Sequence, residues 1–308
     1  CRFFWNTFYY PYQARKLDIL ISPTTHGSFI LKNQIITIHD LISLRYDNIS
    51  AHQRFYFKYL LPFLVSRAKL IIAISEATKK DIIELLHCPE EKVKVIYNGF
   101  DHSHYNMLNV KTSYITEKYG FKNYLLAVGP TYAHKNFETL LKAYNSFDVS
   151  FRDHHPLLIA GGKKAYLGQL KKMVSDLNLD KHVHFLGYVP FELMPSLYRE
   201  AKALVFPSLH EGFGFPLLEA MACGCPVIVS NTSSMPEVCG DAVVYFDPLN
   251  QEALARSIKE VLNNESLQED LRRKGIIQVQ KFSWEQTAKS FKKLIEHHFQ
   301  SPNLPHYV

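Results

Sequence analysis

Pro207-Ser-Leu-His-Glu211-Gly-Phe-Gly-Phe-Pro216-Leu-Leu-Glu219-Ala-Met-Ala-Cys-Gly224-Cys-Pro226-Val-Ile-Val-Ser230 is the stretch that decides the fold. Its pattern predicts a glycine loop after a strand, then a helix, then another strand. Pro216 suits the first helical residue, because its φ is already fixed and it has no N–H to leave unpaired. Gly224 suits the position just past the helix end. Such units repeat in parallel α/β sheets.

The same loop carries groups that suit a ligand with both phosphate and hydroxyl groups. Gly212 and Gly214 allow the backbone to approach a ligand closely. Free N–H groups at a helix start favour phosphate. Glu211 in the loop, and Glu219, which we expect in the first helical turn, are acceptors that suit sugar hydroxyls. The loop therefore suggests a nucleotide sugar as the ligand.

The rest of the chain alternates short apolar runs with helical patterns, which predicts doubly wound parallel sheets. The predicted strands are residues 18–22, 34–39, 69–74, 92–96, 124–128, 157–160, 183–185, 203–206, 227–229 and 243–246. The predicted helices are residues 52–66, 76–86, 136–147, 164–178, 191–200, 250–263, 266–281 and 284–299. Ser75 and Ser283 are placed to cap two of these helices. Residues 101–113 are polar without a period, which predicts a linker.

Composition restricts the class of protein. The 308 residues are 47% hydrophobic and 21% charged, which is usual for a globular protein of two domains. No apolar run approaches the roughly 18 residues of a membrane span. The five cysteines show no zinc spacing, and we interpret them as reduced residues of a cytoplasmic protein. The net charge of +6 suits an anionic donor or an anionic membrane surface, and is too diffuse to indicate nucleic-acid binding.

A second motif, Gly129-Pro-Thr-Tyr-Ala-His134-Lys135-Asn136, follows a predicted strand and opens a helix. A lysine beside helix-start amides favours phosphate. With the stretch at 207–224, this motif resembles the retaining family 4 glycosyltransferases (glycosyltransferase group 1) of the GT-B fold. The His39-Asp40 pair resembles their mannosyltransferase-like subgroup. The resemblance runs from about Asp18 to Trp284. His134 stands where the family often has arginine, so phosphate neutralisation rests more on Lys135 and on backbone amides.

The resemblance implies roles for particular residues. Lys135 would bind the donor pyrophosphate, Glu211 the sugar hydroxyls and Glu219 the ribose hydroxyls. His39, in a Thr-x-His-Asp segment, would reach the donor sugar from the opposite wall, although a structural role for this histidine is the alternative. We therefore predict His39, Lys135 and Glu211 as catalytic residues.

The predicted donor-binding set combines these residues with the strand-end loops. Gly161-Gly162 and the loop at 187–189 resemble family segments, and an ordinary tight turn is the alternative for both. The full predicted set is Gly129, Lys135, Gly161, Gly162, Tyr188, Val189, Glu211, Gly212, Phe213, Gly214, Phe215 and Glu219.

The family's architecture implies two Rossmann-like domains facing across a cleft. We assign residues 1–110 to an acceptor-side domain, 111–284 to a nucleotide-sugar-binding domain, and 285–308 to a helix that returns to the first domain. Only about 17 residues precede Asp18, where the family has further βα units. We therefore expect the first domain to be truncated at its start.

The implied function is transfer of a hexosyl group with retention, to a glycan or lipid-linked acceptor in cell-surface polysaccharide biosynthesis. The donor is expected to be GDP-mannose or a UDP-sugar, with no cofactor. No Asp-x-Asp motif follows a strand, so we predict no metal requirement. The protein is expected in the cytoplasm, with peripheral contact at the inner face of the plasma membrane. A GT-B sugar-nucleotide epimerase and an inactive truncated remnant remain alternatives.

Overall fold

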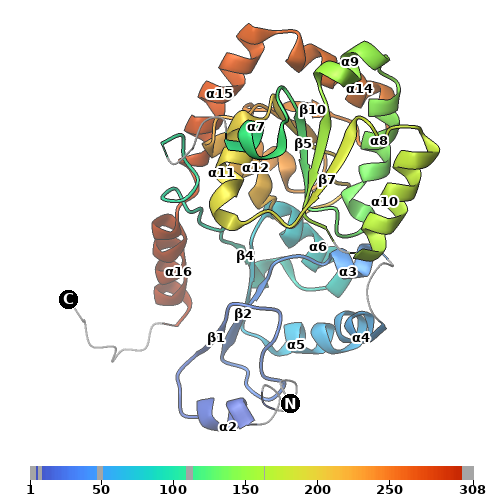
Figure 1. Cartoon of the computed structure of the whole chain (residues 1–308). Helices are drawn as coiled ribbons and strands as arrows, with labels where there is room; N and C mark the ends of the chain where they lie inside the picture. Colours follow the sequence, from blue (N-terminus) through green and yellow to red (C-terminus); the bar gives the residue numbers. More distant parts are fainter. Residues whose placement is uncertain (1–4, 6–8, 47–50, 109–113, 163, 300–308) are drawn as a thin grey trace. The chain divides into compact units, whose positions relative to one another are not determined.

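The computed structural model describes residues 5, 9–46, 51–108, 114–162 and 164–299 (Figure 1). The chain forms two compact units: Cys1–Gly99 with Phe282–Val308, and Phe100–Lys281. Each unit has its own parallel sheet. Residues 100–108 group with the second unit, although their polar pattern suggested a linker. Tyr105 is buried there, with its ring near those of Phe191 and Tyr198.

The first unit has a parallel sheet in the order β1-β2-β3-β4. Every residue of β2 and β3 is buried, as expected for a sheet covered on both faces. The strands are β1 (Leu20–Ser22), β2 (Gln34–Ile38), β3 (Leu70–Ala73) and β4 (Val93–Val95). The helices include α2 (Tyr10–Ala14), α3 (Ile42–Arg45), α4 (Ala51–Phe55), the π-helix η2 (Tyr56–Leu60), α5 (Leu61–Arg67), α6 (Glu76–Leu86) and α16 (Trp284–His298).

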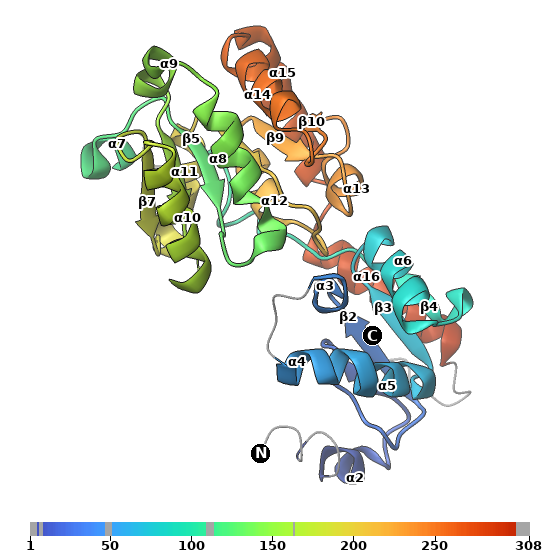
Figure 2. The same cartoon turned by 90° about the vertical axis from the view of Figure 1, so that its right-hand side faces the viewer.

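The last helix, α16, packs on the first sheet (Figure 2). Its apolar side chains, among them Phe291 and Leu294, contact a cluster that includes Ile35 and Ile72 of β2 and β3. Gly99 allows the chain to pass this helix, because a Cβ atom there would lie 2.4 Å from the backbone nitrogen of Trp284. These contacts explain why a segment distant in sequence belongs to the first unit.

The second unit has a parallel sheet in the order β10-β9-β8-β5-β6-β7. The strand order reverses between β5 and β8, which pair with each other. Such a reversal is the switch point at which open α/β sheets bind ligands. The strands are β5 (Leu125–Val128), β6 (Leu157–Ala160), β7 (Val183–Gly187), β8 (Ala203–Phe206), β9 (Val227–Ser230) and β10 (Val244–Phe246).

Helices cover both faces of this second sheet. Three helices enclose a large apolar cluster against one face: α8 (Phe137–Asn145), α10 (Lys164–Asp176) and α14 (Gln251–Leu262). The other face carries α11 (Met194–Glu200) and α12 (Phe215–Ala222), with α15 (Glu265–Val279) packed on α12. The shorter helices are α7 (Tyr114–Tyr119), α9 (Val149–His154) and α13 (Met235–Cys239). The predicted α/β class with two parallel sheets is confirmed.

Candidate functional site

Loops from neighbouring strands meet at the carboxyl edge of the second sheet. The Gly129 amide donates to the Ala160 carbonyl (2.9 Å), and the Gly161 amide donates to the Gly187 carbonyl (2.6 Å). Gly162 has φ 110°, and a Cβ atom there would lie 2.8 Å from Pro130. This position therefore requires glycine. The loops that follow β5, β6 and β7 are thus connected to one another beside the switch point.

Asn136 attaches the Lys135 loop to the neighbouring strand ends. Its backbone is left-handed (φ 58°), a conformation that asparagine tolerates better than most residues. Its side-chain Nδ2 donates to the carbonyls of Pro207 (3.1 Å) and Pro248 (2.9 Å). Lys135 therefore lies on a short turn that is fixed on both sides. The sequence motif indicated the lysine but not this supporting role of the asparagine.

Lys135 and Glu211 form an ion pair at the switch point. Lys135 Nζ lies 2.6 Å from Glu211 Oε1, and both side chains are mostly buried. The Ser208 hydroxyl donates to the same carboxylate oxygen (2.6 Å). Because Lys135 follows β5 and Glu211 follows β8, the strand order brings together residues that are 76 positions apart. Two predicted catalytic groups therefore contact each other, while Ser208 was missed.

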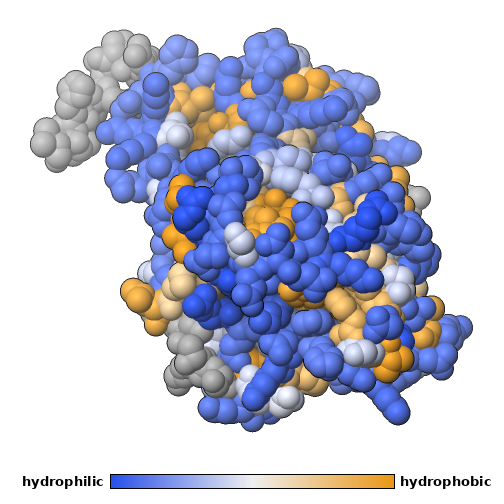
Figure 3. Space-filling view, turned by 90° about the horizontal axis from the view of Figure 1, so that it is seen from above, coloured by the Kyte–Doolittle hydropathy of each residue, from blue (hydrophilic) through white to orange (hydrophobic). Residues whose placement is uncertain are grey.

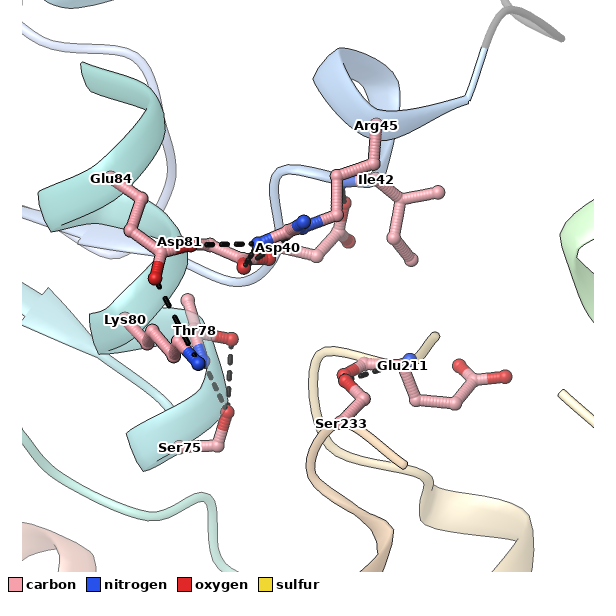
Figure 4. A network of polar contacts seen from close by, with 10 residues as sticks. All are labelled: Asp40, Ile42, Arg45, Ser75, Thr78, Lys80, Asp81, Glu84, Glu211 and Ser233. Carbon is pink, nitrogen blue, oxygen red and sulfur yellow. Dashed lines mark hydrogen bonds and ion pairs between the residues drawn. The ribbon is translucent and has the colours of Figure 1, made fainter. Parts of the chain in front are cut away.

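Two serines after β9 hold the Glu211 loop. The Ser233 hydroxyl accepts from the Glu211 amide (3.2 Å) and donates to the Glu211 carbonyl (2.6 Å), as Figure 4 shows for this pair. The Ser234 hydroxyl lies 3.0 Å from the Glu211 carbonyl and 3.2 Å from that of Phe213. Sequence reasoning missed both serines. The available signal was a Thr-Ser-Ser run, residues 232–234, that begins three positions after a predicted strand of the same sheet.

Helix α12 begins at Phe215, one residue before Pro216, with Gly214 as its N-cap in a left-handed conformation (φ 97°). The prediction that Glu219 lies in the first helical turn is therefore wrong: it is the fifth helical residue. Pro216 is the second helical residue and not the first, which moves Glu219 one position further from the helix start. In the second turn, the Glu219 carboxylate meets α11, where the Tyr198 hydroxyl donates to Glu219 Oε2 (2.7 Å).

The surroundings of Glu219 control its charge. Burial raises the pKa of the Glu219 carboxyl above its usual value, while hydrogen bonds from Tyr198 and Tyr105 act in the opposite direction. Burial also raises the pKa of Tyr198 well above the normal tyrosine value, so this hydroxyl remains a donor. The two tyrosines stabilise the carboxylate form, in which Glu219 can accept two hydrogen bonds from a diol.

His134 contributes no positive charge beside Lys135 at neutral pH. Burial, and secondarily the neighbouring Lys135, lowers the pKa of this imidazole to about 4. Its backbone carbonyl accepts from the Leu209 amide (2.8 Å), which adds a further link between the two loops. At neutral pH, Lys135 is therefore the charged member of this pair of adjacent residues.

His39 belongs to the first unit and directly follows β2. Its exposed imidazole has Nε2 at 2.9 Å from the Pro23 carbonyl. Asp40 accepts from the Ile42 amide (3.1 Å) at the start of α3, and Arg45 of that helix pairs with the buried Asp81 of α6 (Figure 4). These contacts order the turn that carries His39.

The other predicted donor-binding residues differ in exposure. Tyr188 is 83% exposed after β7, whereas the next residue, Val189, is buried. Phe213 is buried, with its ring centroid 5.3 Å from that of the partly exposed Phe215. Gly212 lies in the loop between Glu211 and Phe213. These residues continue the same carboxyl edge of the sheet.

Among the described residues, no group of three or more histidine, cysteine, aspartate or glutamate side chains is arranged to hold a metal ion. No helix in the described ranges combines the length and the apolar character that crossing a membrane requires.

Comparison with known families identifies the class of protein. Residues 112–278 match the family described as glycosyl transferases group 1, and residues 2–104 match glycosyltransferase family 4. The fold and these matches define a GT-B glycosyltransferase. The chain belongs to the group 1 glycosyltransferases, and its first unit matches the family 4 domain.

Several curated relatives are mannosyltransferases by name. The chain is 31% identical over 271 residues to O-antigen chain mannosyltransferase B of Escherichia coli, covering 86% of this chain and 71% of that protein. It is 36% identical over 242 residues to the O-antigen chain mannosyltransferase RfbU of Salmonella typhimurium, covering 79% and 64%. It is 29% identical over 263 residues to the serotype-specific mannosyltransferase WbdA of Escherichia coli, and spans about a third of that protein (32%).

Solved structures show the same fold. Anabaena HepE, in complex with UDP and glucose, has a TM-score of 0.74 and 21% identity, covering 85% of this chain and 71% of HepE. Sucrose-phosphate synthase from Thermosynechococcus elongatus has a TM-score of 0.75 and 20% identity, covering 94% and 76%.

Proposed function

We propose that this glycosyltransferase transfers a mannosyl group from GDP-mannose to a hydroxyl of a glycan or lipid-linked acceptor in surface-polysaccharide biosynthesis. The observation that carries the proposal is the pairing of Lys135 with Glu211 at the switch point of the second sheet, beside the start of α12. The three relatives described above are mannosyltransferases by name, which favours mannose. They do not favour the epimerase or the inactive remnant.

In this proposal Lys135 and the amides at the start of α12 bind the diphosphate. Negative charge grows on the leaving diphosphate as the glycosidic bond breaks. A cation and helix-start dipoles fixed in a mostly buried site stabilise that charge more effectively than water does. Before the donor binds, Glu211 holds the lysine in place through the 2.6 Å ion pair. The diphosphate then competes for the ammonium, which leaves the carboxylate available to hydroxyl groups.

The two glutamates bind the two polyol parts of the donor. Glu211, held by Ser208 and Ser233, accepts hydrogen bonds from the hexose. Glu219, supported by Tyr198, accepts from the ribose hydroxyls.

Retention requires that the acceptor oxygen attack the anomeric carbon from the face that the diphosphate leaves. The acceptor proton then passes to the departing phosphate oxygen, so that the protein need not supply a general base. We propose that the reaction proceeds without a divalent metal, because Lys135 and the amides supply the positive field that the diphosphate requires.

A donor panel tests this function. The full chain is incubated with GDP-mannose, GDP, UDP-glucose or UDP-galactose, with and without a lipid-linked glycan, and nucleotide release and product are followed. We expect acceptor-dependent release of GDP and an α-configured product by NMR. Acceptor-independent conversion of the donor would instead support an epimerase or hydrolase. Binding without turnover of any donor would support the inactive remnant.

We also propose peripheral contact with an anionic membrane through the first unit. Phe55, Tyr59 and Phe63 recur every four residues along α4, η2 and α5, and are 55%, 57% and 52% exposed. Lys58 and Arg67 lie beside these rings. An exposed aromatic stripe flanked by cations suits the interface of anionic lipids.

Vesicle flotation tests the membrane contact. We expect the protein to float with phosphatidylglycerol vesicles and not with phosphatidylcholine vesicles. The Phe55→Ser/Tyr59→Ser/Phe63→Ser variant should lose this behaviour while it keeps donor affinity. Equal flotation of the triple variant and the wild type would exclude this surface.

A further inference from the structure

The second unit has a pocket of about 420 Å³ at the edge of the sheet opposite to the donor loops. Its walls come from residues 120–123 before β5, residues 152–156 before β6 and residues 181–184 at the start of β7. All strands of this sheet are parallel, so their amino ends share one edge and their carboxyl ends share the other. The proposed donor groups follow the carboxyl ends. The pocket is therefore separate from them.

Basic side chains surround this pocket. Lys122, Arg152 and Lys181 line it, against a single carboxylate, Asp153. His182 Nε2 lies 3.0 Å from Asp153 Oδ1, so that the carboxylate already has a partner inside the wall. In the described part of the chain, neither lysine ammonium has a hydrogen bond or an ion pair. The pocket consequently offers positive charge to a ligand.

Buried polar atoms in the same wall lack partners. His182 is only 8% exposed, and its Nδ1 has no hydrogen bond within the described ranges. The buried Nε of Arg152 also has none there, and the guanidinium is held only by a long hydrogen bond from Nη1 to Asn145 (3.3 Å). Unsatisfied buried polar groups are costly, so an oxygen-rich ligand that draws these side chains toward it would relieve the cost.

We propose that this pocket binds a phosphate group, at a site distinct from that of the sugar donor. Lysines act as point charges for phosphate, and an arginine fork matches its oxygens. The volume lies within the range of about 300–1,000 Å³ that is usual for small-ligand sites. The rings of Phe121 and His184, with centroids 4.4 Å apart, add a wall beside the charges. Figure 3, which looks onto the molecule from above the view of Figure 1, shows a mostly hydrophilic face that is interrupted by hydrophobic patches.

The test uses inorganic pyrophosphate and the imidazole NMR signals of His182 and His184. Pyrophosphate would also bind near Lys135. The signals of His182 and His184 nevertheless report on the new site alone, because both residues line the pocket. In the wild type their signals should shift and saturate. Lys122→Gln/Lys181→Gln should weaken this binding by at least roughly tenfold, as the loss of charge-assisted hydrogen bonds requires. The control Lys142→Gln/Lys172→Gln removes two exposed lysines of α8 and α10 and should behave like the wild type.

A second arm identifies the source of the phosphate. Phosphatidylcholine vesicles with and without phosphatidic acid replace pyrophosphate, and the same three proteins are compared. Saturable shifts with pyrophosphate that the double variant loses would support a soluble phosphorylated ligand. Shifts with phosphatidic acid alone, lost in the same variant, would support the site with a lipid phosphate as its ligand. No shift with either probe, or equal affinity in the double variant and the control, would overturn the proposal, whatever the result for sugar transfer.

Discussion

Removing the Tyr198 hydroxyl should make nucleotide binding depend on pH. This hydroxyl donates to Glu219 Oε2 at 2.7 Å, and Tyr198 is fully buried. Glu219 must be ionised to accept both ribose hydroxyls in the proposed site. Burial raises its pKa, and the tyrosine hydrogen bonds counteract that rise. In Tyr198→Phe the carboxyl should therefore take up its proton at a higher pH. As pH is lowered, nucleotide affinity should begin to fall at a higher pH in this variant than in the wild type.

The size of the effect follows from the single bond removed. A hydrogen bond to a charged group contributes about 1.5–3 kcal/mol. Tyr105 also opposes the rise in the pKa of Glu219, so the lower end applies. About 1.5 kcal/mol corresponds to a nucleotide affinity roughly tenfold lower in Tyr198→Phe than in the wild type, at pH values where Glu219 is protonated in the variant but still ionised in the wild type. A carboxyl whose pKa is raised by folding contributes to the free energy of unfolding at low pH. This contribution is lost as pH rises through the pKa of the carboxyl in the folded state. The variant should therefore be destabilised more in alkaline than in acidic buffer.

Calorimetric titration of GDP across the pH range measures the first effect, and denaturant unfolding at two pH values measures the second. Tyr245→Phe is the matched control, because its hydroxyl donates to the neutral Gly240 carbonyl (2.6 Å) in the same unit. This control should lose stability without a change in the pH dependence of binding. If Tyr198→Phe and Tyr245→Phe gave the same pH profile as the wild type, Glu219 would not contact the nucleotide in the proposed way.

Three further predictions concern Glu219, His134 and the metal requirement. Glu219→Ala should weaken GDP and the intact donor by similar amounts, about 1.5–3 kcal/mol by calorimetry, because both contain the ribose; unchanged GDP affinity would exclude the assignment. Folding lowers the pKa of His134 from 6.5 to about 4. The free energy of unfolding should therefore fall by roughly 3 kcal/mol in total as pH falls through this range. Unfolding of His134→Gln should lack this component, whereas the exposed His154→Gln should retain it. Transfer should survive EDTA, and loss of activity that Mn²⁺ or Mg²⁺ restores would reveal a metal requirement.

The elements of the second unit were predictable because their signals are local. The apolar run at 203–206 became β8, and Gly224 takes a left-handed conformation (φ 68°) just beyond α12, as its position after an apolar helix indicated. Ser75 and Ser283 accept hydrogen bonds from the amides of Thr78 and Gln286, as predicted for helix caps. Such features depend on residues a few positions apart.

The support around the candidate site was not predictable, because it depends on contacts between distant segments. Tyr198 meets Glu219 only because α11 and α12 lie on the same face of the sheet. Ser233 reaches the Glu211 loop from the end of the adjacent strand β9. A buried tyrosine or a strand-end serine has many ordinary roles, so residue type alone does not indicate these contacts.

The most direct test of the proposed donor site compares Lys135→Ala with Lys142→Ala, which removes an exposed lysine of the neighbouring helix α8. Mannosyl transfer from GDP-mannose is measured together with the affinities for GDP and guanosine. Lys135→Ala should lower turnover by about 10²-fold and weaken GDP, while guanosine affinity stays unchanged, because the ammonium acts on the diphosphate. Lys142→Ala should match the wild type in all three measurements. Equal turnover in the two variants would contradict the assignment of the diphosphate to Lys135 and to the switch point of the second sheet.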